Sequence, residues 1–111
     1  MICDEGQGAR GRAGQWFSCQ IWDVVPDIIT LAKSLGGGLP LGAILSTEKI
    51  FSTFLDPPLS HLTTFGGNPV SCAAAIAAFD VIRDDDLINK STDDNILIDD
   101  KLEDETIKNK S

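Results

Sequence analysis

The chain has 111 residues, enough for one domain and too few for two domains with separate cores. Hydrophobic residues make up 42% of it and charged residues 23%, which is typical of a soluble globular protein. Seventeen acidic and nine basic residues give a net charge of -8, which argues against nucleic acid and anionic membranes as partners because both bind positive surfaces.

No apolar run approaches the roughly 20 residues that a membrane helix needs, and acidic residues follow Met1 in place of a basic leader. We therefore expect a cytoplasmic protein. The three cysteines are widely spaced without a CxxC pair, so we expect reduced thiols and neither a disulfide framework nor a zinc site. Residues 1–88 have the Gly- and Pro-punctuated pattern of an α/β domain. Residues 89–111 form an acidic polar tail, expected to be a solvated helix near 101–109 or disordered.

In chain order, residues 1–3 are expected to end a strand. Residues 6–14 (GQGARGRAG) are expected to form a flexible loop, since four glycines preclude regular structure there. The apolar run 28–32 predicts a short buried strand that ends at Lys33. The three glycines at 36–38 predict a turn.

A second strand is expected at residues 41–45, followed by a short helix at 47–55. The best-defined helix begins at Asn68, a good N-cap, has Pro69 at its first helical position and runs to Ile82. The small residues along this helix permit close packing against a sheet.

Three segments contain candidate functional residues, and the first is Asp4-Glu5 with Gln7. A carboxylate at the C-terminal end of a strand lies where α/β sheets bind ligands. The alternative interpretation is a turn aspartate that caps a neighbouring loop.

The second candidate is Lys33, which follows an apolar strand and precedes a glycine turn. Such a lysine is expected to be partly desolvated, and its amine is then nucleophilic, as Schiff-base chemistry requires. The alternative is an ordinary surface lysine at a strand end. A P-loop does not fit, because Lys33-Ser34 precedes the glycines and does not follow them.

The third candidate is the segment HLTTFGGNP, residues 61–69. Two threonine hydroxyls, a Gly-Gly hinge and a helix N-terminus make a phosphate cradle, and the alternative is an N-cap with its preceding turn. His61 is expected to be a packing or hydrogen-bonding residue, since no second metal ligand lies at a suitable spacing.

These segments occur in a specific order. The strings DEGQGARGRAGQWF, VVPDIITLAKSLGGGLPLGAILS and HLTTFGGNPVSCAAAIAAFDVI closely resemble the class III aminotransferases, which are pyridoxal-phosphate-dependent enzymes of fold type I. The resemblance extends from Ile2 to about Ile88. It implies an α/β fold, namely part of the aspartate aminotransferase-like large domain with a mixed, mostly parallel sheet and flanking helices, truncated.

The resemblance also implies residue roles. Asp4 would pair with the pyridine nitrogen of the cofactor, and the Gln7 amide would lie near its phenolic oxygen. Lys33 would form the internal aldimine and move the proton between substrate and cofactor. Thr64 would reach across a dimer interface to the cofactor phosphate of the other subunit. Glu5 matches a frequent family residue to which no role is assigned.

The implied function is transfer of an amino group from an amino acid or amine to a 2-oxo acid by a homodimer that uses pyridoxal 5'-phosphate. The alternatives are a related decarboxylase or aminomutase, or an inactive truncated fragment. The upstream phosphate loop, the ring-stacking aromatic and the C-terminal domain are missing. We therefore expect an internal fragment that is inactive alone, with residues 28–32 and 41–45 exposed at unpaired edges.

The sequence departs from the family pattern at residues 6–14. The family usually has V-Q-T-G-F-G-R-T-G where this chain has GQGARGRAG. Loss of the first valine and the middle threonine is expected to loosen the loop, and Arg10 replaces an apolar residue.

Overall fold

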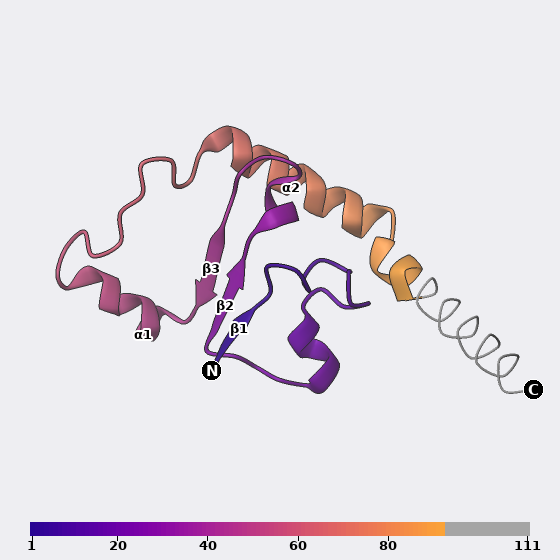
Figure 1. Cartoon of the computed structure of the whole chain (residues 1–111), viewed down its shortest axis with the longest axis horizontal. Helices are drawn as coiled ribbons and strands as arrows, with labels where there is room; N and C mark the ends of the chain where they lie inside the picture. Colours follow the sequence, from indigo (N-terminus) through magenta and orange to yellow (C-terminus); the bar gives the residue numbers. More distant parts are fainter. Residues whose placement is uncertain (93–111) are drawn as a thin grey trace, which may run out of the picture.

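The computed structural model describes residues 1–92 and contains there a three-stranded sheet of order β1-β2-β3 (Figure 1). Strand β1 (Ile2–Asp4) is parallel to β2 (Ile28–Leu31), and β2 is antiparallel to β3 (Ala43–Ser46). The register places Asp4 beside Thr30. The predicted α/β class with a mixed sheet is confirmed, with one parallel and one antiparallel pair among these strands.

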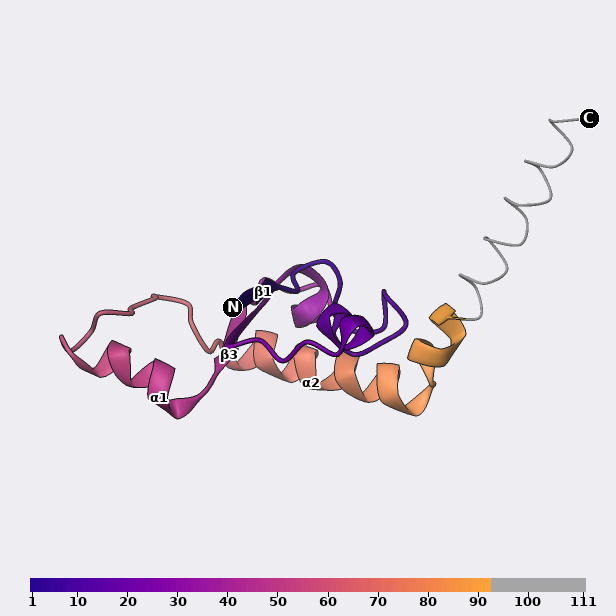
Figure 2. The ribbon, with the colours of Figure 1, turned by 90° about the horizontal axis from the view of Figure 1, so that it is seen from below.

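The helical elements of the described residues are mostly short. They are η1 (Ser18–Trp22), η2 (Lys33–Gly36), α1 (Glu48–Phe51), η3 (Ser52–Leu55) and α2 (Pro69–Asp84). The predicted helix from Asn68 to Ile82 is confirmed as α2, which continues to Asp84. Figures 1 and 2 show that α2 lies to one side of the strands and passes the end at which β2 leads into η2. Residues 87–92 are again helical.

The predicted strand at 28–32 is present as β2, but two expectations about it are wrong. It ends at Leu31, and Lys33 is instead the first residue of η2. It is also the central strand, paired on both sides, so it is not an unpaired edge. The edge strands are β1 and β3, because a sheet must have two edges and β2 lies between them.

The other elements differ from expectation mainly at their ends. Strand β3 begins two residues after the predicted start at Leu41. The predicted helix at 47–55 is split into α1 and η3, and its N-cap residue Thr47 makes no side-chain capping hydrogen bond. Helix η1 was not predicted.

A small apolar cluster joins β2, η2 and the glycine-rich segment 6–14. Ala9, Leu31 and Leu35 are buried in it. The partly buried side chains packed around them are Phe17, Ile29, Leu41, Ala43 and Phe79. Segment 6–14 is irregular, as predicted, but this packing and its own backbone hydrogen bonds hold it in place.

Gly37 lets η2 approach α2 closely. Its φ is +59°, and a Cβ there would lie 3.0 Å from the Ala74 carbonyl oxygen and 3.3 Å from the Ala78 Cβ. Glycine is the residue that adopts this backbone conformation without steric cost. The glycine turn and the alanine-rich helix therefore fit together, and they fix the position of η2, which begins with Lys33.

Within residues 1–92, no helix is both long and apolar enough to cross a membrane. The helix expected near 101–109 lies outside the described residues.

Seventeen large hydrophobic side chains are exposed in the described part of the chain, whereas only five apolar residues are buried there. We therefore predict that the isolated 111-residue chain aggregates and unfolds without a cooperative transition, because burial of apolar surface is the main stabilising term. Thermal circular dichroism and light scattering test this. A monomer that unfolds with a sharp, reversible midpoint would contradict it.

Candidate functional site

Asp4 ends β1 with an exposed carboxylate that is held by its Oδ1 atom. Oδ1 accepts hydrogen bonds from the Gly6 N–H at 3.0 Å and from the Thr30 hydroxyl at 3.1 Å. These bonds, in that order, and the positive charge of Lys33 lower the pKa of Asp4 below its ordinary value. Through Oδ1, Asp4 therefore acts as the turn aspartate that the alternative interpretation predicted. No hydrogen bond within residues 1–92 reaches Oδ2, which remains free to bind a ligand.

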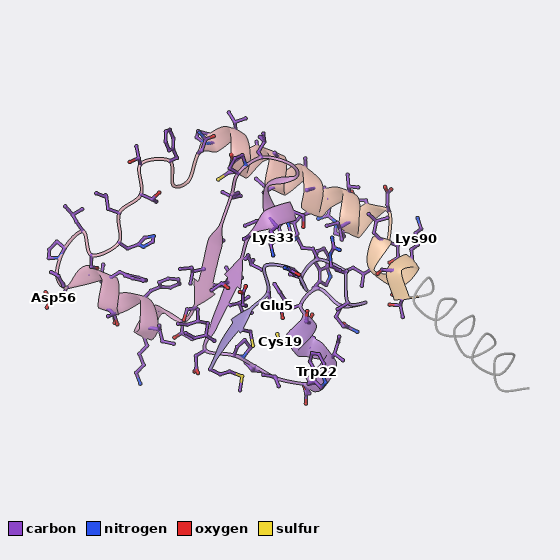
Figure 3. All side chains as sticks on the ribbon, in the orientation of Figure 1. Glu5, Cys19, Trp22, Lys33, Asp56 and Lys90 are labelled. Carbon is purple, nitrogen blue, oxygen red and sulfur yellow. The ribbon has the colours of Figure 1, made fainter. Side chains whose placement is uncertain are left out.

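Lys33 lies just beyond the carboxyl end of β2, at the start of η2 (Figure 3). Its φ of +53° is left-handed, which is unusual for a residue other than glycine. It lines a cavity of about 250 Å³ together with Gly6, Gln7, Arg12 and Ser34. Lys33 is exposed, so residues 1–92 do not shield its amine from solvent as we expected.

Three of the four predicted site residues lie together. Gln7 and Lys33 line the same cavity, and Gly6, which also lines it, donates its N–H to Asp4. The carboxyl ends of the parallel pair β1 and β2 bring these residues together, as expected for α/β sheets.

Thr64 is not part of this cavity. It is exposed in the segment between η3 and α2, which forms a long loop at the left of Figure 1. Beside this segment lies a separate open cavity of about 780 Å³ with mainly apolar walls. His61 lies there with its ring 5.2 Å from that of Phe54, which agrees with the packing role expected for it.

The N-terminus of α2 is already capped. Asn68 Oδ1 accepts the N–H groups of Val70 at 3.0 Å and Ser71 at 3.2 Å. The N-cap interpretation of segment 61–69 is therefore correct. These two N–H groups do not form the predicted phosphate cradle, because they already have an acceptor within the chain.

Glu5 has a structural environment that sequence reasoning missed. Its side chain is only 3% exposed, and it accepts the backbone N–H groups of Ser18 at 3.0 Å and Cys19 at 2.8 Å (Figure 3). Burial alone would raise the pKa of Glu5, but these N–H bonds outweigh it and the pKa is lowered. The buried carboxylate therefore anchors η1 to the end of β1.

Gly8 leaves room for this contact. A Cβ at Gly8 would lie 3.0 Å from Glu5 Oε2 and would clash with the Ser18 hydroxyl at 1.8 Å. The family pattern has a threonine at the position of Gly8. The threonine side chain would have to displace the Ser18 side chain here. The expectation that this departure loosens the loop is not supported at this position.

Comparison with known proteins identifies the family. The model of the family described as aminotransferase class III matches residues 1–111. The chain belongs to the class III aminotransferases. The match continues beyond Ile88, so the expectation that the resemblance ends there is wrong.

Solved structures of class III aminotransferases and related transaminases superpose on the chain. An S-selective transaminase from Arthrobacter sp. with alanine bound has a TM-score of 0.87 and 33% identity over 96% of this chain. Acetylornithine aminotransferase from Elizabethkingia anophelis has a TM-score of 0.87 and 38% identity, also over 96%. Ornithine aminotransferase from Toxoplasma gondii has a TM-score of 0.74 and 36% identity over 79% of this chain, and it was found with partial occupancy of PLP at its active site.

The chain spans about a quarter of the length of these aminotransferases. It covers 24% of the Arthrobacter protein, 26% of the Elizabethkingia protein and 20% of the Toxoplasma protein.

The residues around Lys33 offer three kinds of functional group to a ligand. They supply a primary amine at Lys33, an ionised carboxylate with a free oxygen at Asp4, and a neutral amide at Gln7. Such groups are chemically compatible with a ligand that carries an aldehyde, a basic ring nitrogen and a phenolic oxygen, as pyridoxal phosphate does.

The buried carboxylate of Glu5 yields a stability prediction for the protein that contains this chain. Glu5→Gln places an amide N–H₂ group against backbone N–H donors, so we expect it to destabilise the fold by about 1–3 kcal/mol and lower the thermal midpoint. Because folding lowers the pKa of Glu5, its contribution is complete above the ordinary glutamate pKa and is lost as the pH falls through the lowered pKa of the folded state.

The matched control is Glu48→Gln, since Glu48 is an exposed glutamate in the first turn of α1. Thermal midpoints of both variants are compared with the parent at neutral pH and again below the ordinary pKa. Equal midpoints for the Glu5 and Glu48 variants at neutral pH would contradict the anchoring role of Glu5.

Proposed function

We propose that the protein containing this chain is a pyridoxal-phosphate-dependent transaminase, which moves an amino group from an amino acid or amine to a 2-oxo acid. The observation that carries the proposal is the arrangement of Lys33 and Gln7 in one cavity beside the ionised carboxylate of Asp4. Family membership supports the same reaction.

Each of these residues has a distinct task in the proposal. When bound, pyridoxal phosphate supplies an electron sink for the negative charge that develops at the substrate α-carbon. The free Oδ2 atom of Asp4 holds a proton at the ring nitrogen. The Gln7 amide donates to the phenolic oxygen. Lys33 Nζ anchors the cofactor and then takes up and returns the proton of the α-carbon as a general base and acid.

The proposal includes a cytoplasmic homodimer in which Thr64 acts in the site of the other subunit. Its support is that Thr64 is exposed on a segment away from the cavity of its own chain. A neutral hydroxyl on such a segment is suited to donate to a phosphate of a neighbouring subunit.

Covalent trapping tests the proposal. Full-length protein is incubated with pyridoxal phosphate and treated with borohydride, and the modified peptide is located by mass mapping. We expect the cofactor to be fixed to Lys33 Nζ, because Asp4 and Gln7 orient the ring there.

Lys49 is the internal control, since it is an exposed lysine in α1 remote from the cavity residues. Nonspecific reaction would mark Lys49 as readily as Lys33. Modification of Lys49 without preference for Lys33 would overturn the proposal.

A further inference from the structure

Arg10 connects the glycine-rich segment to the backbone on both sides of Lys33. Its Nη2 atom donates to the Ala32 carbonyl oxygen at 3.2 Å and also to the Ser34 hydroxyl. These are the residues immediately before and after Lys33, so one guanidinium group spans the lysine.

The backbone that Arg10 spans has an unfavourable conformation. Ala32 is extended, with φ -157° and ψ -160°, and Lys33 then turns sharply into the left-handed region at φ +53°. A side chain on Cβ makes this region costly, and such conformations persist only where the surroundings enforce them. Packing of Gly37 against α2 holds the far end of η2, but nothing in that contact restrains Lys33 itself.

The position of the Arg10 guanidinium group is itself energetically unfavourable. Its Nε and Nη1 atoms are buried and have no hydrogen-bond partner within the described residues. Burial of a charged donor without full pairing is unfavourable, and the burial together with the nearby charge of Arg12 lowers the pKa of Arg10. The family pattern usually has an apolar residue at this position.

We propose that Arg10 is a positioning residue that holds the left-handed turn at Lys33 and thereby fixes the direction in which its amine enters the cavity. The role of the lysine rests on the proposed function, whereas the restraint of the turn does not. Both bonds come from the single Nη2 atom, one to the residue before Lys33 and one to the residue after it, so together they restrain the intervening residue better than one bond would.

The test uses full-length protein and the variants Arg10→Met, Arg10→Lys and Ser34→Ala. The first readout is amide hydrogen exchange in the peptide that covers residues 32–36, in the absence of cofactor. We expect exchange there to become about tenfold faster in Arg10→Met, the effect of losing a charge-assisted hydrogen bond. Arg10→Lys keeps a charged N–H donor on a shorter side chain, so it should accelerate exchange to a lesser degree.

The second readout is the ratio of borohydride labelling at Lys33 to labelling at Lys49. We expect this ratio to fall in Arg10→Met, since the amine is no longer directed into the cavity. Adding Ser34→Ala to Arg10→Met should change neither readout further, because the two side chains act through one contact.

Arg83→Met is the matched control, because Arg83 is an exposed arginine of α2 that pairs with Asp80 and Asp84. It should leave exchange at residues 32–36 and the labelling ratio unchanged. Unchanged exchange and labelling in a folded Arg10→Met or Arg10→Lys protein would overturn the positioning role. If the parent protein shows no preference for Lys33, the proposed function fails, while the exchange measurement still decides whether Arg10 restrains the turn.

Discussion

The arrangement of the site depends on the left-handed turn at Lys33, where β2 ends and η2 begins. An uninterrupted strand would carry the lysine past the end of β1. The turn instead keeps it beside the cavity that Gly6 and Gln7 also line. Two contacts hold the two ends of η2: Gly37 packs on α2 at its far end, and Arg10 bonds to the residues that flank Lys33 at its start.

The adjacent carboxylates of Asp4 and Glu5, at the end of β1, make different contacts. Side chains alternate between the two faces of an extended segment, so adjacent residues point to opposite sides. Asp4 remains exposed beside the cavity, whereas Glu5 is buried against the first backbone N–H groups of η1. The pKa of each is lowered, in Asp4 chiefly by the Gly6 N–H and in Glu5 by N–H bonds that outweigh burial. Two adjacent residues thus connect the cavity side of β1 to η1.

Local sequence signals predicted much of this structure. Asn68-Pro69 marked the start of α2, and the apolar run after Pro26-Asp27 marked β2, because capping and hydrophobic patterning act over a few residues. The pairing of β2 on both sides, the burial of Glu5 and the bridge made by Arg10 depend on contacts between distant segments. The hydrophobic periodicity of a sequence does not predict contacts between distant segments. Arg10 was noticeable only as a departure from the family pattern, and that departure did not reveal its bonding partners.

We propose that Lys33 and Asp4 act on the same ring from the ends of the adjacent parallel strands β1 and β2. A crystal structure of the protein that contains this chain, with pyridoxal phosphate bound, tests this proposal. We expect a covalent bond between Lys33 Nζ and the cofactor, with Asp4 Oδ2 at a hydrogen-bond distance of about 2.7–3.2 Å from the ring nitrogen. A ring nitrogen that contacts another residue, or a Lys33 side chain directed away from the cavity into solvent, would contradict it.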